Sequence, residues 1–253
     1  MSCPETLSSR QNAVIKSFRA LGSDAHLRSS EALFLCDGDK LLEEALRSGA
    51  EIQAVLWKDR RNDSFGEFPE EYVLKPELFD YVSPLKNSPG PLFSVRLREL
   101  RPETSPDNVL VLEGVQDPGN VGTVIRTADA FGIGAVILLE GCADAWAPKT
   151  VRAGMGAAFR QPVLRMSREA LPAYCREHGL RLCGAALSER AEDLRSISLA
   201  HTAVAVGSEG RGLSPELLAL CETELIIPMR GEAESLNAAV AASILMWEMQ
   251  RRS

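Results

Sequence analysis

Val109-Leu110-Val111-Leu112 is the first of six predominantly apolar segments in the C-terminal half of this 253-residue chain. A strand without apolar–polar alternation is typical of a parallel sheet that is covered on both faces. Helical patterns separate most of these segments, so an α/β domain with a parallel sheet is predicted. The other strands are expected at Ala135–Leu139, Gln161–Leu164, Leu182–Ala186, Ala203–Val206 and Leu225–Ile227. Helices are expected at Val121–Phe131, Arg168–His178 and Pro215–Cys221, and after Asn237.

The N-terminal half has a different order of elements and predicts a separate small α/β domain over residues 1–98. Residues 99–107 are charged, contain Pro102 and Pro106 and show no apolar periodicity, so they are predicted to be a linker. The C-terminal domain is then expected over 108–253. Within the first domain, helices are expected at Ser9–Leu21, Gly38–Arg47 and from Pro76, and strands at Ala32–Cys36, Ala54–Trp57 and Tyr72–Leu74.

The composition is that of a soluble globular protein, with 45% hydrophobic and 25% charged residues. No apolar run is long enough to span a bilayer, and the N-terminus has neither the basic start nor the apolar core of a signal peptide. None of the six cysteines is spaced C-x-x-C or lies beside a histidine, which argues against a disulfide framework or a metal site. We therefore expect a cytoplasmic protein with reduced thiols.

The net charge of −7 argues against bulk binding to nucleic acid but leaves room for local basic regions. Arg10, Lys16, Arg19 and Arg28 form one such region, and residues from Lys149 and Arg152 to Arg168 form another. The alternative reading is that both are ordinary solvated helix faces.

Ligands of a parallel sheet bind beyond the carboxyl ends of its strands, and unusual loops follow three of the predicted strands. The first loop runs from Asp117, with Asn120 as a plausible N-cap and Arg126 on the following helix. A helix N-terminus with an arginine nearby suits a phosphate, although an ordinary turn with a surface arginine has the same pattern.

The second loop, Gly207–Glu216, has three glycines in six residues, so its backbone can turn tightly and approach a ligand closely. Its spacing is neither G-x-G-x-x-G nor a P-loop, which argues against a dinucleotide site and an NTPase. Glu209 could accept a hydrogen bond from a hydroxyl group or orient an arginine, or it could be a solvated loop acid.

The third loop follows Pro228 and places Ser235 and Asn237 at the start of a helix rich in alanine. These side chains could simply cap the helix. The small residues would also let a ligand, a chain segment or a second subunit approach closely. The three histidines are scattered and none neighbours a nucleophile, so the site is suited to positioning and charge stabilisation rather than covalent catalysis.

Taken together, the motifs Asn120–Gly132, Gly207–Ser214 and Ile227–Ala241 resemble the three motifs of the SpoU (TrmH-type) RNA 2′-O-ribose methyltransferases, in the same order. These enzymes belong to the SPOUT superfamily. The stretches Ser8–Lys16 and Phe34–Ala45 resemble the RNA-binding extension of this family, which has the fold of ribosomal protein L30e.

The resemblance implies a SPOUT domain with a deep trefoil knot, S-adenosylmethionine as methyl donor, a homodimer, and ribosomal rather than transfer RNA as substrate; the absence of metal-ligand spacing predicts no metal. It implies catalytic roles for Asn120, Arg126, Glu209, Ser235 and Asn237. It implies donor contacts from Leu187, Gly207, Gly210, Ile227, Met229 and Leu236. Arg10, Lys16, Arg19, Arg28, Lys149 and Arg152 are the candidate RNA contacts.

Arg126 is often given the activating role in this family. A guanidinium keeps its proton, so we expect Arg126 to hold an RNA phosphate and stabilise the developing alkoxide. Two other functions have to be considered for this pattern. A non-catalytic RNA-binding or ribosome-assembly protein could keep the same fold, and a nicotinamide dehydrogenase would need a G-x-G-x-x-G turn that Gln116–Asn120 does not provide.

Overall fold

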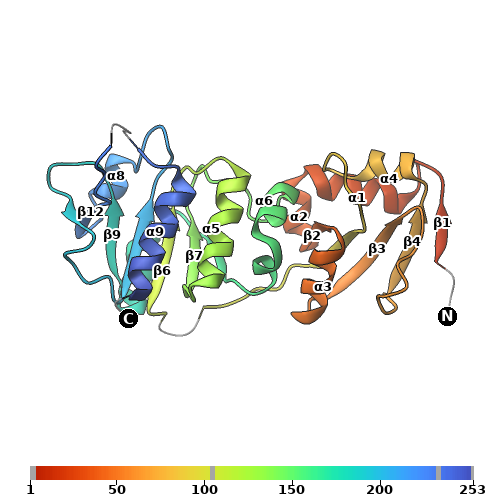
Figure 1. Cartoon of the computed structure of the whole chain (residues 1–253), viewed down its shortest axis with the longest axis horizontal. Helices are drawn as coiled ribbons and strands as arrows, with labels where there is room; N and C mark the ends of the chain where they lie inside the picture. The colour runs from red at the N-terminus through yellow and green to blue at the C-terminus, as the bar shows by residue number, and fades with distance from the viewer. Residues whose placement is uncertain (1–3, 103–105, 232–234, 252–253) are drawn as a thin grey trace. The chain divides into compact units, whose positions relative to one another are not determined.

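A computed structural model describes residues 4–102, 106–231 and 235–251. The chain divides into two compact units, each built around its own sheet (Figure 1). The first unit consists of Met1–Arg98 together with Asp144–Phe159, and the second of Glu99–Ala143 together with Arg160–Ser253. Of the predicted linker, residues 99–102 and 106–107 belong to no helix or strand, and residues 103–105 lie outside the described part.

The second unit contains a seven-stranded sheet in the order β10-β12-β9-β11-β6-β7-β8, with every pair of neighbours parallel. The predicted parallel sheet is therefore confirmed. Its central strands are buried along their whole length, as their unbroken apolar sequences require. The strands are β6 (Asn108–Leu112), β7 (Ala135–Leu138), β8 (Val163–Arg165), β9 (Arg181–Ala185), β10 (Glu192–Asp193), β11 (Thr202–Val206) and β12 (Thr223–Ile226).

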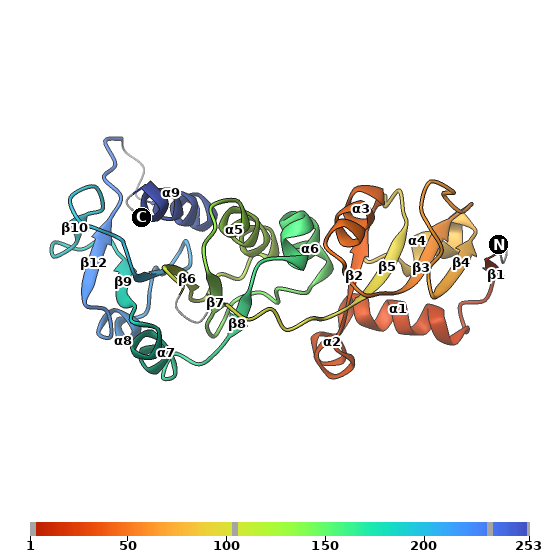
Figure 2. The same ribbon diagram turned by 90° about the horizontal axis from the view of Figure 1, so that it is seen from below.

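Helices cover both faces of this sheet (Figure 2). Helices α5 (Pro118–Ala130) and α9 (Ala238–Arg251) lie side by side on one face, where α9 also contacts β6 and β11. Helices α7 (Leu171–His178) and α8 (Pro215–Leu218) cover the other face, where Leu171 and Leu217 are fully buried against the sheet. Helix α8 ends earlier than its predicted bound, Cys221.

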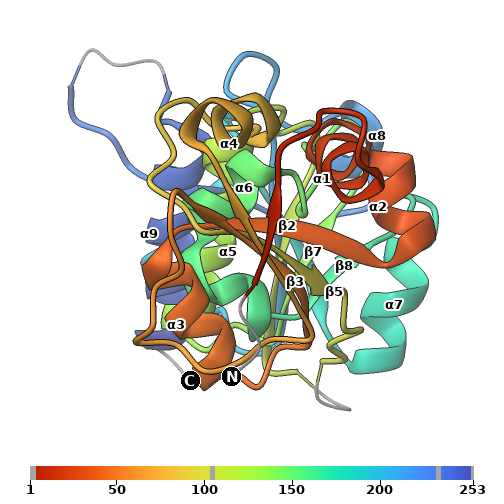
Figure 3. The ribbon, with the colours of Figure 1, turned by 90° about the vertical axis from the view of Figure 1, so that its right-hand side faces the viewer.

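The first unit contains a mixed five-stranded sheet in the order β1-β4-β3-β5-β2. Strands β1, β4 and β3 are parallel, and β5 runs antiparallel to both of its neighbours. Helices α1 and α4 pack on one face and α3 on the other (Figure 3). The bounds are β1 (Glu5–Leu7), α1 (Ala13–Ser23), α2 (Ala25–Glu31), β2 (Leu33–Asp37), α3 (Asp39–Arg47), β3 (Ile52–Lys58), β4 (Glu70–Leu74), α4 (Pro76–Val82) and β5 (Leu92–Arg96).

The segment 144–159 packs with the first unit, which differs from the continuous C-terminal domain expected over 108–253. It forms α6 (Pro148–Gly154) and a 3₁₀ turn, η1 (Met155–Phe159). Val151 and Ala158 join the core beside Phe34 and Phe93, because they complete the apolar face of the first sheet beside α3. The apolar residues of this segment predict burial but do not specify which sheet they cover.

An ion pair fastens this segment to the first unit. The Arg28 guanidinium is 4% exposed and donates to Asp144 Oδ2 from Nε at 3.0 Å and from Nη2 at 2.7 Å. Its Nη1 donates to the backbone oxygen of Leu21 at 2.6 Å. A buried guanidinium with these partners has a structural role, so Arg28 does not belong among the RNA contacts proposed from the sequence.

The five described cysteines are free thiols, and Cys3 lies outside the described residues. Burial is the main cause that raises the pKa of Cys175 and Cys183 to about 11 and that of Cys221 to about 12. These thiols therefore stay protonated and unreactive near neutral pH. Among the described residues, no helix is both long and apolar enough to span a membrane.

Replacing Arg28 by Ala is expected to lower the free energy of unfolding by about 2–3 kcal/mol, because the part-buried Asp144 would lose its cationic partner and keep only the hydrogen bond from Trp146 N. Urea unfolding measures this change. Arg47→Ala is the matched control, since that guanidinium is 68% exposed and its ion pairs with Glu43 and Glu44 are solvated. Equal, small losses in the two variants would contradict the structural role of Arg28.

Candidate functional site

The side chain of Glu209 joins the three loops at the carboxyl edge of the second sheet. Its Oε1 accepts hydrogen bonds from Asn120 Nδ2 at 2.7 Å, from Asn237 Nδ2 at 2.5 Å and from the backbone N–H of Ala238 at 3.3 Å. Asn237 Nδ2 also lies 3.2 Å from Asn120 Oδ1. Three of the five predicted catalytic residues therefore form one hydrogen-bonded cluster, which we call the Glu209 cluster.

Local capping explains why both asparagines can take part in this cluster. Asp117, not Asn120, is the N-cap of α5, and its Oδ1 accepts from the backbone N–H of Asn120 at 2.9 Å. The sequence prediction of Asn120 as cap was therefore wrong by one turn, and the Asn120 amide is free to reach Glu209. Asn237 both caps the start of α9 and joins the cluster. Its Oδ1 accepts a hydrogen bond from Ala239 N at 3.0 Å, while its Nδ2 donates to Glu209.

The glycine loop after β11 folds back on itself. A Cβ atom on Gly207 would lie 2.0 Å from the carbonyl carbon of Gly212, so no other residue fits at position 207 without a shift of the backbone. Gly212 has a φ of +65° and its N–H donates to Ser208 O at 2.8 Å, which closes the turn. This tight turn places Glu209 at its tip, facing the other two loops.

A second carboxylate, missed in the sequence analysis, holds the far end of the same loop. Glu113 accepts from the backbone N–H of Ser214 at 2.7 Å and from its hydroxyl at 2.8 Å. Arg168 Nη1 lies 3.4 Å from Glu113 and 3.0 Å from Ser214 Oγ. Glu113 comes directly after the first apolar strand, so the sequence already places it at the carboxyl edge of the sheet, where the three loops lie. That position is the signal that could have identified it.

A cavity of about 540 Å³ lies between the loops after β9, β11 and β12 and the start of α9. This volume is typical of small-molecule sites, which span roughly 300–1,000 Å³. Glu209 and Ser235 also line it, so the cavity adjoins the Glu209 cluster. Every donor-binding residue predicted from the sequence contributes to its wall, namely Leu187, Gly207, Gly210, Ile227, Met229 and Leu236. Ala185, Ala186, Leu213, Leu218 and Leu225 contribute further apolar wall that the sequence analysis did not identify.

Arg126 stands apart from the Glu209 cluster. It is exposed on α5, and among the described residues it forms no ion pair or side-chain hydrogen bond. An arginine without a carboxylate partner keeps its full capacity to bind an anion. Arg126 is therefore placed on the helix that begins at the site, with its guanidinium available to a ligand.

The remaining RNA candidates lie in the first unit. Arg10, Lys16 and Arg19 are exposed at and just before α1, and Lys149 and Arg152 are exposed on α6. The described residues hold no group of three or more His, Cys, Asp or Glu side chains suited to a metal ion.

A sequence profile of the SpoU rRNA Methylase family matches residues 107–247. The chain is 35% identical to the 23S rRNA (guanosine(2553)-2′-O)-methyltransferase RlmP of Bacillus subtilis, over 96% of this chain and 98% of that protein.

Two crystal structures of S-adenosylmethionine-bound proteins are also similar. An rRNA methyltransferase from Sinorhizobium meliloti is 27% identical, with a TM-score of 0.83 and coverage of 98% of this chain and 97% of that one. The SpoU methyltransferase AviRb from Streptomyces viridochromogenes is 25% identical, with a TM-score of 0.83 and coverage of 95% and 98%. The match of the profile to the three loop motifs, and the similarity over nearly the whole chain, place this protein in the SpoU rRNA methylase family.

Proposed function

We propose that this protein transfers a methyl group from S-adenosylmethionine to a ribose 2′-hydroxyl of structured RNA, with ribosomal RNA favoured over transfer RNA. The observation that carries the proposal is the Glu209 cluster, which joins the three family motifs, beside a cavity of about 540 Å³ that the second and third motifs help to line. The 2′-O-methylation of 23S rRNA in the name of the B. subtilis relative supports the choice of reaction and substrate. The reduced thiols and family membership favour the cytoplasm as its place of action.

The cavity suits S-adenosylmethionine in chemistry as well as in size. Leu187, Ile227 and Leu236 offer apolar surface for an adenine ring, and the glycine loop offers backbone groups without intervening side chains. Met229 and Gly210 complete the proposed donor contacts. When bound, S-adenosylmethionine supplies an electrophilic methyl group on a sulfonium. In the net reaction the ribose oxygen gains the methyl, the carbon–sulfur bond breaks, and the hydroxyl proton is released.

The residues of the cluster position the RNA in this proposal. Glu209 holds the Asn120 and Asn237 amides in fixed orientations, which leaves few rotations to be lost when the ribose binds. Ser235, at the wall of the cavity, offers a hydroxyl to the same region. Arg126 binds an RNA phosphate and stabilises negative charge that develops on the ribose oxygen. The proton leaves through that phosphate or through a water molecule, because the guanidinium keeps its own proton.

We also propose the two finer features of fold that the family resemblance implies, a deep trefoil knot near the C-terminus and an L30e-like first unit. The return of the chain after β12, which brings α9 against β6, β11 and α5, is compatible with the knot. The mixed sheet with helices on both faces is compatible with the L30e-like fold. A crystal structure in which the chain is traced from β11 to α9 would test the knot, and one without threading would exclude it.

Calorimetric titration with S-adenosylmethionine tests the enzymatic function. We expect binding, and we expect Leu236→Ala to weaken it by about tenfold through the loss of apolar contact. Leu220→Ala is the control, because Leu220 is 41% exposed and lies outside the cavity. No binding by the intact protein would favour the non-catalytic RNA-binding alternative. Mapping of ribose methylation in RNA from cells that lack the protein would identify the nucleotide.

Glu209→Ala is expected to lower kcat by about a hundredfold, because Asn120 and Asn237 lose the acceptor that orients them. Single-turnover methyl transfer to rRNA measures the effect. Glu216→Ala removes another exposed acid near the same loop and should leave kcat unchanged. A Glu209→Ala enzyme as fast as the original would exclude an organising role for this carboxylate.

Arg126→Lys is expected to lower kcat by about tenfold to a hundredfold, since an ammonium cannot reproduce the planar two-point contact of guanidinium with phosphate. The same single-turnover assay, together with RNA affinity, separates this effect from weaker binding. Full activity with unchanged RNA affinity would show that no specific guanidinium role exists.

We propose that a second copy of the chain covers an apolar stripe on α9. Val240, Ile244 and Trp247 recur at helical spacing and are 48%, 36% and 57% exposed. The Trp247 ring packs against Phe131, the C-cap residue of α5, with centroids 5.7 Å apart, so the stripe is held in place beside the end of the adjacent helix. A rigid, exposed aromatic flanked by aliphatic side chains is typical of a protein interface, and the homodimer implied by the family resemblance supplies its occupant.

Trp247→Glu should convert the dimer to a monomer, because a charge would be buried without a partner at the interface. Light scattering during size-exclusion chromatography measures the mass. Leu220→Glu is the matched control, since it charges an exposed apolar residue away from α9 and should stay dimeric. A monomeric original chain would overturn the proposed dimer.

A further inference from the structure

Two arginines of the first unit pack on a single tyrosine ring. The Cζ atom of Arg10 lies 4.2 Å from the centroid of the Tyr81 ring, and that of Arg19 lies 4.0 Å from it. Arg10 comes just before α1, Arg19 lies in α1, and Tyr81 lies in the last turn of α4. The Cζ atoms of the two arginines therefore lie no farther apart than the sum of these two distances.

The Tyr81 ring is fixed in place. Tyr81 is half-buried and packs against the core between α1, α4 and the sheet. Its backbone oxygen accepts a hydrogen bond from Arg19 Nη1 at 2.6 Å. Contact with the face of a ring leaves the edge of a guanidinium, which carries its N–H donors, open to another partner. The ring therefore orients both guanidiniums without neutralising their charge.

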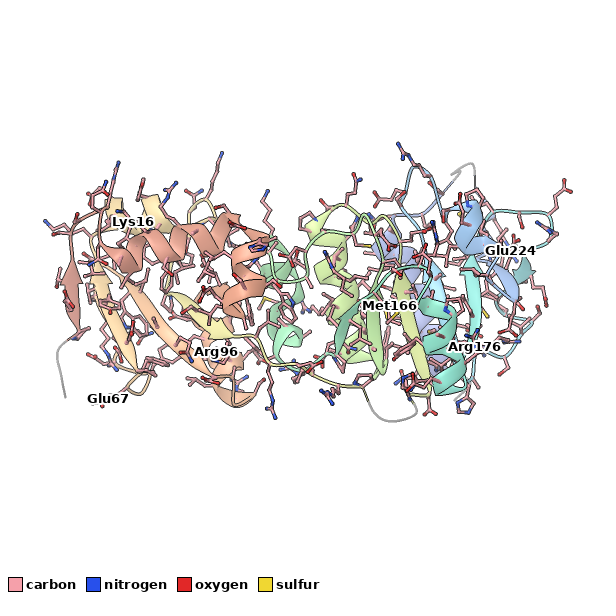
Figure 4. All side chains as sticks on the ribbon, turned by 180° about the vertical axis from the view of Figure 1, so that it is seen from behind. Lys16, Glu67, Arg96, Met166, Arg176 and Glu224 are labelled. Atoms are coloured by element: carbon pink, nitrogen blue, oxygen red, sulfur yellow. The ribbon has the colours of Figure 1, made fainter. Side chains whose placement is uncertain are left out.

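These two arginines differ from most others in the same unit. Arg28, Arg47, Arg61 and Arg96 all form ion pairs with carboxylates. Arg10 and Arg19 are exposed and form no ion pair among the described residues. Lys16, also exposed on α1 and labelled in Figure 4, adds a third cation between them in sequence. A chain with net charge −7 thus keeps a local group of unneutralised cations at this place.

We propose that Arg10, Tyr81 and Arg19 form a clamp that binds the phosphodiester backbone of RNA. A guanidinium donates two parallel hydrogen bonds to phosphate oxygens, and two guanidiniums with a restricted separation suit two phosphates of one strand. Tyr81 is a positioning residue that lowers the entropy lost when the arginines bind. The clamp rests on the proposed function only for the identity of RNA as the ligand, and its test does not require methyl transfer.

Binding of a short fluorescein-labelled RNA hairpin, followed by fluorescence anisotropy between about 50 and 200 mM KCl, tests the clamp. The double variant Arg10→Ala/Arg19→Ala should bind about tenfold or more weakly. The slope of log K against log salt should fall in magnitude by about 1.4–1.8, as expected for two lost phosphate contacts. Tyr81→Phe should bind like the original, whereas Tyr81→Leu should bind more weakly because the aromatic platform is lost.

The matched control is Arg47→Ala/Arg96→Ala, which removes the same formal charge from the same unit at arginines that are already paired with carboxylates. Its RNA affinity and salt slope should stay close to those of the original. A purely structural role for Arg19 at the end of α4 would lower the unfolding temperature without changing the salt slope. An equal salt slope in the clamp variant and the control would overturn the proposal. Poly-glutamate that competes for the site as well as unlabelled RNA does would also overturn it, because the ligand would then be an acidic polypeptide.

Failure of the clamp can be distinguished from failure of the proposed function. Titration with S-adenosylmethionine concerns the second unit alone and should be unaffected by the clamp variant. Suppose that the intact protein binds the hairpin but does not bind S-adenosylmethionine and methylates no RNA. If the clamp variant then binds the hairpin more weakly than the intact protein, only the enzymatic proposal fails. If methyl transfer proceeds and the clamp variant keeps its affinity and salt slope, only the clamp fails.

Discussion

One carboxylate oxygen organises the site in the second unit. Glu209 Oε1 accepts from Asn120, 89 residues earlier, and from Asn237, 28 residues later. Hydrogen bonds to an ionised acceptor are stronger than neutral ones, so a single anion can hold two side-chain amides and one backbone N–H together. The parallel sheet makes this possible, because β6, β11 and β12 all end at the same edge. Glu113 completes the arrangement by holding the other end of the glycine loop at Ser214.

The cations of the protein fall into two groups according to their partners. Arg28 and Arg168 are tied to carboxylates and to neighbouring polar groups, and they stabilise the fold. Arg10, Arg19 and Arg126 are exposed and, among the described residues, form no ion pair. The proposed attraction of this acidic protein to RNA rests on exposed cations of the second kind, among which Lys16, Lys149 and Arg152 are also candidates, because a neutralised guanidinium contributes little to the release of counterions. Candidate RNA contacts are therefore arginines that are exposed and have no carboxylate partner, whereas structural arginines are paired with carboxylates.

Much of the fold follows from local sequence patterns. Six of the seven strands of the second sheet were predicted, and the buried strands β6, β7 and β11 gave the clearest signal, because burial on both faces favours a continuous apolar run. Strands β1, β5 and β10 and helices α2 and α6 were missed. Strands β1 and β10 are only three and two residues long, which is too short for a recognisable pattern. Strand β5 follows the turn-rich residues 84–91, and Ser94 and Arg96 interrupt its apolar sequence. The packing of residues 144–159 on the first unit was also not predicted, since the apolar residues of a segment do not indicate which surface they pack against.

The sequence by itself determined the parallel sheet and the edge that carries the loops, because these depend on local composition, spacing and strand direction. The resemblance of its motifs to a known family added the six donor-contact residues, all of which line the cavity. Only the tertiary structure decided which polar atoms meet. It made Asp117 the cap of α5 and so freed Asn120 to bind Glu209, it buried Arg28 against Asp144, and it placed Tyr81 under Arg10 and Arg19. Hydrogen bonds and ring contacts form only when two groups lie within a few ångströms of each other. Packing sets these distances, and no local sequence pattern encodes them.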